Sequence, residues 1–146
     1  MKDIDNQLED NIVDALLGAA AYRTEEQLRE INIVRGERTF FKFKVHGLTE
    51  DEFIRCRRQN TKNRGRRDEL VDWIRYSGQV IYEATTADDK KRLWQNHDVW
   101  DGLNVASGVD VVLKVLTPAE RAKILEVIES ISGFDDIDLD TLVQNL

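Results

Sequence analysis

Apolar residues recur at helical spacing through most of the chain. Near the N-terminus they fall at every third or fourth position between Ile4 and Ala19, which predicts an amphipathic helix from about Asp5 to Tyr22. The apolar stripe of this helix is narrow and rich in alanine, so it packs weakly by itself. We therefore expect residues 1–30 to form a helical arm that docks on a partner.

The pattern then changes from helical spacing to alternation. Between Thr39 and Val45 aromatic and aliphatic residues alternate with lysines, and a short apolar run, Ile31–Val34, precedes them across a turn that contains Gly36. Alternation on both sides of a glycine-containing turn is typical of a β-hairpin.

Helical spacing returns after Gly47. Thr49 followed by Glu52 predicts a capping box, and the helix that it opens is expected to end near Asn60. After a loop that contains Gly65, a second helix is expected from about Asp68 to Glu83. The residues that this helix is expected to bury are Leu70, Trp73, Ile74 and Ile81. Whether it also buries Tyr82 is undecided from the spacing.

The C-terminal third contains three shorter patterns. One or two helical turns are expected around Leu93 and Trp94, a turn at Asp101–Gly102, and a short helix capped by Ser107.

The last predicted helix has signals at both ends. Thr117 is placed to cap it, Pro118 fits its first position, and Gly133 is placed for a left-handed C-cap. Phe134 could fold back against the apolar stripe of this helix.

Together these elements predict a mainly α fold, a compact helical domain with one β-hairpin near the N-terminal third. We expect three parts: the arm 1–30, a hairpin-plus-helix domain over 31–134, and a tail over 135–146. The tail alternates aspartates with aliphatic residues and cannot form a core of its own. It is expected either to fold onto a basic or apolar groove or to remain a frayed terminus.

Composition narrows the cellular setting. The chain has 146 residues, enough for one domain, and its single cysteine, Cys56, excludes an internal disulfide and fits a reducing cytosol. The first residues lack the apolar run of a secretory signal, and no stretch approaches the roughly 18 uncharged residues of a membrane span. We expect a cytoplasmic protein that does not bind membranes.

Residues that support catalysis or metal binding do not form a recognisable group. Nothing in the sequence brings either histidine to Cys56, and zinc, calcium and phosphate-loop motifs are missing. The arginines beside Cys56 could lower the pKa of its thiol, but a structural cysteine is the favoured interpretation. The sequence predicts no enzyme, no cofactor and no metal.

Basic residues are concentrated in one segment. Seven bases and no acid lie between Ile54 and Arg67, in a chain whose net charge is −7. Such a run could neutralise several phosphates, which makes a nucleic-acid-binding regulator that uses Arg55–Arg67 one hypothesis. The run holds no aromatic residue for base stacking, so the other interpretation is a solvated surface that faces acids of the protein itself or of a partner.

Three tryptophans are expected to pack in the core, with Trp100 the one most open to solvent because it stands beside the predicted turn. The residues predicted to bind a partner combine this tryptophan with the basic run and the apolar residues near the C-terminus. They are Arg55, Arg58, Arg64, Arg66, Arg67, Trp100, Phe134, Ile137, Leu139 and Leu142.

Three segments, in this order, resemble a known family. They are Phe43–Phe53, the end of the middle helix at Ile81–Thr85, and Leu116–Glu120 with its continuation to Phe134. In order and spacing they resemble the XkdN-like tail assembly chaperones of phages and defective prophages of Gram-positive bacteria, over about Ile31–Asp135.

The resemblance implies a non-enzymatic protein of the bacterial host cytoplasm. Such proteins are thought to coat the tape measure protein, keep its apolar helices from aggregating, and give way as tail tube subunits polymerise. We therefore predict a tail assembly chaperone whose partners are the tape measure protein and the tail tube protein, with self-association left open. Binding to nucleic acid is the alternative and is not expected from the resemblance.

Overall fold

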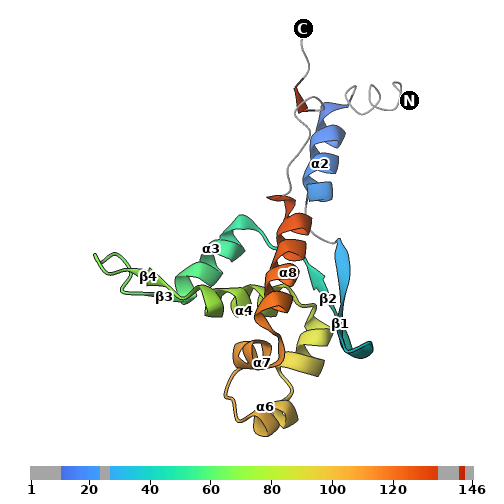
Figure 1. Ribbon diagram of the computed structural model, residues 1–146. Helices are drawn as coiled ribbons and strands as arrows, with labels where there is room; N and C mark the ends of the chain where they lie inside the picture. Colours follow the sequence, from blue (N-terminus) through green and yellow to red (C-terminus); the bar gives the residue numbers. More distant parts are fainter. Residues whose placement is uncertain (1–10, 24–26, 135–141, 144–146) are drawn as a thin grey trace.

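The chain folds as a two-stranded hairpin followed by a series of helices (Figure 1). The computed structural model describes residues 11–23, 27–134, 142 and 143. The strands are β1 (Leu28–Arg35), β2 (Arg38–His46), β3 (Thr61–Lys62) and β4 (Leu70–Val71). The helices are α2 (Ile12–Arg23), α3 (Glu50–Gln59), α4 (Trp73–Ala84), α5 (Ala87–Asp89), α6 (His97–Leu103), α7 (Gly108–Val115) and α8 (Pro118–Glu129), with π-helical turns η1 (Lys90–Trp94) and η2 (Ser130–Phe134).

The predicted hairpin is confirmed. β1 pairs antiparallel with β2, and the two residues between them, Gly36 and Glu37, have φ of 57° and 65°. Two successive residues in the left-handed region match the twist of the flanking strands, which is why the turn needs a glycine. An antiparallel bridge from Val45 to Thr85 then attaches β2 to the end of α4.

The core lies where the inner face of this hairpin meets α4, α7 and α8. Phe43 is 1% exposed, and its ring meets the Trp94 ring edge to face at a centroid distance of 5.3 Å. The core residues with no exposed surface are aliphatic or small: Val45, Cys56, Val80, Ile81, Ala84, Val112 and Ile128. The mainly α fold with one long hairpin is therefore as predicted.

The predicted helix starts are also confirmed. Thr49 accepts a hydrogen bond from the backbone N–H of Glu52, whose carboxylate accepts one from the N–H of Thr49, and Thr117 forms the same reciprocal pair with Glu120. Ser107 accepts from the N–H of Asp110. Each of these side chains satisfies backbone donors that the first helical turn leaves without partners.

The prediction for the helix over Asp68–Glu83 is wrong at its start. The helix begins at Trp73, capped by Asp72, and the residues before it form β4, which pairs with β3 in a second, shorter ladder. Leu70 lies on β4, and the first turn of the helix faces solvent instead of the core. The predicted burial of Leu70, Trp73 and Ile74 is therefore wrong: they are 64%, 61% and 62% exposed.

One predicted turn is wrong, and one predicted helix end is confirmed. Asp101–Gly102 is not a turn but lies inside α6, which Asn104 ends with a left-handed φ of 57°. Gly133 has a left-handed φ of 94°, which confirms the predicted left-handed glycine. The ring of Phe134 contacts Phe53 on α3 edge to face, at a centroid distance of 5.4 Å.

Helix α2 confirms a helical N-terminal segment for the residues described there. Its aliphatic side chains are exposed: Ile12 by 59%, Val13 by 61%, Leu16 by 63% and Leu17 by 65%. In Figure 1 the helix extends away from the body that the hairpin and α3–α8 form. Within the described ranges, the helices are all too short or too polar to cross a bilayer.

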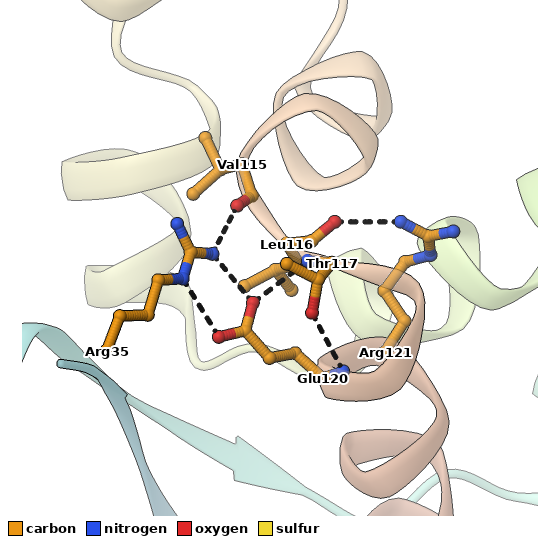
Figure 2. A network of polar contacts seen from close by, with 6 residues as sticks. All are labelled: Arg35, Val115, Leu116, Thr117, Glu120 and Arg121. Atoms are coloured by element: carbon orange, nitrogen blue, oxygen red, sulfur yellow. Dashed lines mark hydrogen bonds and ion pairs between the residues drawn. The ribbon is translucent and has the colours of Figure 1, made fainter.

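Arg35 connects the hairpin to the last helix. At the end of β1, its guanidinium contacts Glu120 in the first turn of α8 and the carbonyl oxygen of Val115 (Figure 2). On the other side of the junction between α7 and α8, Arg121 donates to the carbonyl oxygen of Leu116 at 2.8 Å (Figure 2). The Arg35 contacts thus hold this junction to the end of β1.

Candidate functional site

The basic segment and the exposed start of α4 are held together by Asn60. Its side-chain amide donates to the backbone carbonyl oxygen of Cys56 at 2.8 Å, and its backbone carbonyl oxygen accepts from the N–H of Asp72 at 2.8 Å. Asn60 is buried, so these hydrogen bonds are shielded from water. The end of α3 is thereby fixed beside the start of α4.

The loop between β3 and β4 is built from tight turns. Asn63 and Gly65 have φ of 58° and 75°, in the left-handed region where asparagine and glycine are favoured. The Asn63 amide donates to the Asp68 carboxylate at 3.0 Å, and the N–H of Gly65 donates to the Glu69 carboxylate at 3.4 Å. The two acids that follow the arginine run therefore brace the turn itself.

An apolar hollow lies at the base of this loop. It has a volume of about 370 Å³ and is lined by Lys62, Leu70, Val71, Asp72, Trp73 and Ile74. The rings of Trp73 and Tyr76 meet edge to face at a centroid distance of 5.4 Å, which orients the exposed indole. Large exposed apolar side chains that gather around a hollow mark an interaction site.

A second, more polar hollow shares one wall with the first. It has a volume of about 460 Å³ and is lined by Arg57, Arg58, Thr61, Arg64, Glu69, Val71 and Trp73. Val71 and Trp73 line both hollows. We call the combined area the basic-apolar surface and define it by Arg57, Arg58, Lys62, Arg64, Leu70, Val71, Trp73 and Ile74.

The bases of this region have no acidic partner in the described part of the chain. Ion pairs with N···O distances up to 4.0 Å involve Arg35, Arg55, Arg75, Arg92 and Lys123, and none of them involves a base between Arg57 and Arg67. The side chains in question are exposed: Arg57, Arg58, Lys62, Arg64, Arg66 and Arg67. Their positive field is therefore available to an acidic partner.

The structure unites some of the residues predicted to bind a partner and separates others. Arg58 and Arg64 line the polar hollow, while Arg66 and Arg67 lie on the exposed loop beyond it. Arg55 instead faces Glu83 at 4.0 Å.

The predicted apolar residues lie elsewhere. Trp100, on α6, is half-buried, donates to the Trp94 carbonyl oxygen at 2.7 Å and stacks on His97. Phe134 and Leu142 are 55% and 65% exposed. Ile137 and Leu139 lie outside the described residues.

Sequence reasoning missed the most exposed aromatic of the described core helices, Trp73. Helical spacing placed Trp73 and Ile74 on a buried stripe, whereas they occupy the first turn of a helix that begins after Asp72. Asp72 three residues before Arg75 was the available signal, since aspartate is a favoured N-cap.

Cys56 is a packing residue. It is fully buried, and burial raises the pKa of its thiol to about 11, an effect that the nearby Arg55 only partly opposes. The arginines beside it therefore do not activate it. Among the described residues no three histidine, cysteine or acidic side chains form a group that could hold a metal ion.

Comparison with known proteins places the chain in a family. No curated protein matches it. The crystal structure of the protein yqbn is similar to it with a TM-score of 0.48 and 20% identity, covering 75% of this chain and 88% of the other. The family described as phage XkdN-like tail assembly chaperone protein matches residues 13–145. Because that match spans nearly the whole sequence, the chain belongs to the phage XkdN-like tail assembly chaperone family.

Proposed function

We propose that this protein binds the tape measure protein of its phage or prophage and assists assembly of the tail tube around it. The family match over residues 13–145 carries the proposal. A chaperone of this kind acts by binding and release, without catalysis and without a cofactor. It would work in the cytoplasm of the bacterial host, where tails assemble.

The exposed apolar side chains support a binding role. Within the described residues, one group of them lies on α2 and another around the apolar hollow at the start of α4. Apolar surface left open on an otherwise highly charged chain is what a holder of apolar segments requires. The tail tube protein is the second partner in this proposal, since the chaperone must give way to it.

Co-expression tests the proposal. The chain is produced with the tape measure protein encoded beside it, and the soluble fraction is resolved by gel filtration. We expect the chaperone to raise the soluble fraction of the tape measure protein and to elute with it. A tape measure protein that stays insoluble and forms no complex would contradict the proposal.

The bases between Arg57 and Arg67 support one rival function, a nucleic-acid-binding regulator. Their lack of acidic partners in the described residues is the observation that favours it. Such binding would weaken steeply with salt. A mobility shift with duplex DNA or RNA at low salt, lost in Arg58→Glu/Arg64→Glu, would establish this rival; no shift would exclude it.

A further inference from the structure

We propose that the basic-apolar surface binds an amphipathic helix of a partner protein that carries carboxylates along one side of its apolar stripe. The inference rests on the proposed function, because it names the chemistry of the segment that the chaperone holds. The surface consists of an apolar hollow and a basic hollow that meet at Val71 and Trp73.

The apolar half exposes side chains that a bound partner would bury. Leu70, Trp73 and Ile74 each have more than three fifths of their surface in water, although they border a hollow. Trp73 already leans on Tyr76, so little side-chain freedom is lost when a ligand covers it. Tryptophan at the centre of a contact is the residue type that most often dominates binding energy.

The basic half determines the charge of the partner. Arg57, Arg58 and Arg64 line the second hollow, and none of them has an ion-pair partner among residues 11–23, 27–134, 142 and 143. Glu69 also lines this hollow, but its carboxylate accepts from the N–H of Gly65 at 3.4 Å and forms no ion pair with these arginines, so an arriving carboxylate need not break one. The arriving carboxylate would form charge-assisted hydrogen bonds, which are shorter and stronger than neutral ones.

The relation between the two hollows favours a helix. In a helix, residues at i, i+3 and i+4 form one row and charged residues can flank that row on the same exposed side. Apolar and acidic side chains can then enter two adjoining hollows together. In an extended segment, successive side chains point to opposite faces, so acids that alternate with apolar residues would point away from the surface.

The apolar half also favours a protein over a nucleic acid. Phosphates would contact the arginines but would leave Leu70 and Ile74 in water. The net charge of −7 opposes the approach of a long polyanion, whereas a short helix with a few acids meets only the local positive field.

The test uses two synthetic helical peptides with one apolar stripe. One carries glutamates along a single side of the stripe and the other carries lysines there. Binding to the full chain is measured by calorimetry at low and high salt. We expect the glutamate peptide to bind, the lysine peptide not to bind, and added salt to weaken binding.

Variants locate the contact. Arg58→Glu/Arg64→Glu is expected to weaken binding of the glutamate peptide about tenfold or more and to allow binding of the lysine peptide. Ile74→Ser is expected to weaken it by about the same factor. The matched controls, Lys42→Glu/Lys91→Glu and Val34→Ser, change exposed residues away from this surface and should leave affinity unchanged.

Several results would overturn the inference. They are equal binding of both peptides, an unchanged affinity in Arg58→Glu/Arg64→Glu, or binding of duplex DNA through these arginines without binding of the glutamate peptide. Binding that appears only after removal of residues 135–146 would assign the surface to the chain's own tail.

Co-expression separates this inference from the proposed function. If the tape measure protein is held equally well by the wild type, by Arg58→Glu/Arg64→Glu and by Ile74→Ser, the chaperone function stands and the surface is wrong. If the wild type holds no tape measure protein but binds the glutamate peptide as expected, the surface chemistry stands and the proposed function fails.

Discussion

Arg35 and Glu120 form a two-pronged ion pair between the end of β1 and the first turn of α8. The Nε atom of Arg35 donates to Oε2 at 3.0 Å and its Nη2 atom donates to Oε1 at 2.6 Å (Figure 2). The same carboxylate accepts from the backbone N–H of Thr117 at 2.9 Å. One acid therefore caps a helix and fastens the hairpin to it.

This pair makes stability depend on pH. Hydrogen bonding from Arg35 lowers the pKa of Glu120 from 4.5 to about 2. The folded chain therefore keeps the carboxylate charged where the unfolded chain would protonate it. The contribution is complete above about pH 4.5 and is lost as the pH falls toward 2.

We expect Glu120→Gln to lower the free energy of unfolding by about 1 kcal/mol at pH 7, since the Arg35 side of the pair is open to solvent. Glutamine can still accept from Thr117, so the change isolates the charge. Urea unfolding at pH 7 and pH 3 should show the difference from wild type shrinking at the lower pH. In the control Glu126→Gln, whose partner Lys123 is 81% exposed, the change in free energy of unfolding should be smaller at both pH values. A difference for Glu120→Gln that is as large at pH 3 as at pH 7 contradicts the prediction.

Gly108 allows the start of α7 to approach two other elements closely. A Cβ atom at this position would overlap Cε1 of Tyr82 and lie 3.0 Å from the backbone oxygen of Trp94. Because a backbone atom cannot move aside cheaply, we expect Gly108→Ala to destabilise the fold by about 1–3 kcal/mol.

Gly102 is the matched control for this substitution. It lies within α6, and a Cβ atom there meets nothing within 4 Å. Gly102→Ala should therefore be neutral or stabilise the protein by up to about 1 kcal/mol, because alanine favours helix. Thermal unfolding compares the melting temperatures of Gly108→Ala and Gly102→Ala. Equal values would show that the close approach of α7 does not contribute to stability.

The parts of this fold that the sequence predicts correctly are those that local signals determine. The hairpin and the starts of α3, α7 and α8 depend on neighbouring residues: an alternating run beside Gly36, and hydroxyl caps at Thr49, Ser107 and Thr117. Such signals are readable because their hydrogen bonds span only a few residues.

The start of α4 was harder to predict from the sequence, because it depends on a contact between residues that are not neighbours in the chain. Asn60 binds the backbone of Asp72 and so fixes where the β3–β4 ladder ends and the helix begins. Without that contact, the spacing of Leu70, Trp73 and Ile74 fits a buried helical stripe. The basic run was identified from the sequence, but its apolar neighbours in the candidate site were not. Asp72, a favoured N-cap, marks where the helix begins, but it does not show that the first turn is exposed.

A buried hydrogen-bonded chain links α4 to η1. The indole N–H of Trp94 donates to the hydroxyl oxygen of Thr85 at 2.9 Å, and that hydroxyl donates to the carbonyl oxygen of Ile81 at 2.6 Å. Thr85 and Trp94 are each 1% exposed. We expect Thr85→Val to cost about 1–3 kcal/mol, because it leaves the indole donor buried without a partner.

A double-mutant cycle isolates that interaction. Thr85→Val and Trp94→Phe together should cost less than the sum of the single changes, as the second removes the donor that the first leaves unpaired. Urea denaturation of the four proteins measures the coupling. Strictly additive free energies would show that the hydrogen bond does not contribute to stability. The control is Thr39→Val, at an exposed position of β2, which should change the free energy of unfolding little.

The thiol of Cys56 reports global opening of the fold. Burial raises its pKa to about 11 from the ordinary 9, so only about one thiol in a thousand is ionised at pH 8. We expect the native protein to resist a disulfide reagent at pH 8, with a reaction rate that rises in urea along with the unfolded fraction. The unfolded thiol ionises near pH 9 and the folded one only near 11, so stability should also fall as the pH rises above about 9. Rapid labelling of the native chain at pH 8 would contradict both expectations. A Cys56→Ala variant, which has no thiol to label, provides the baseline.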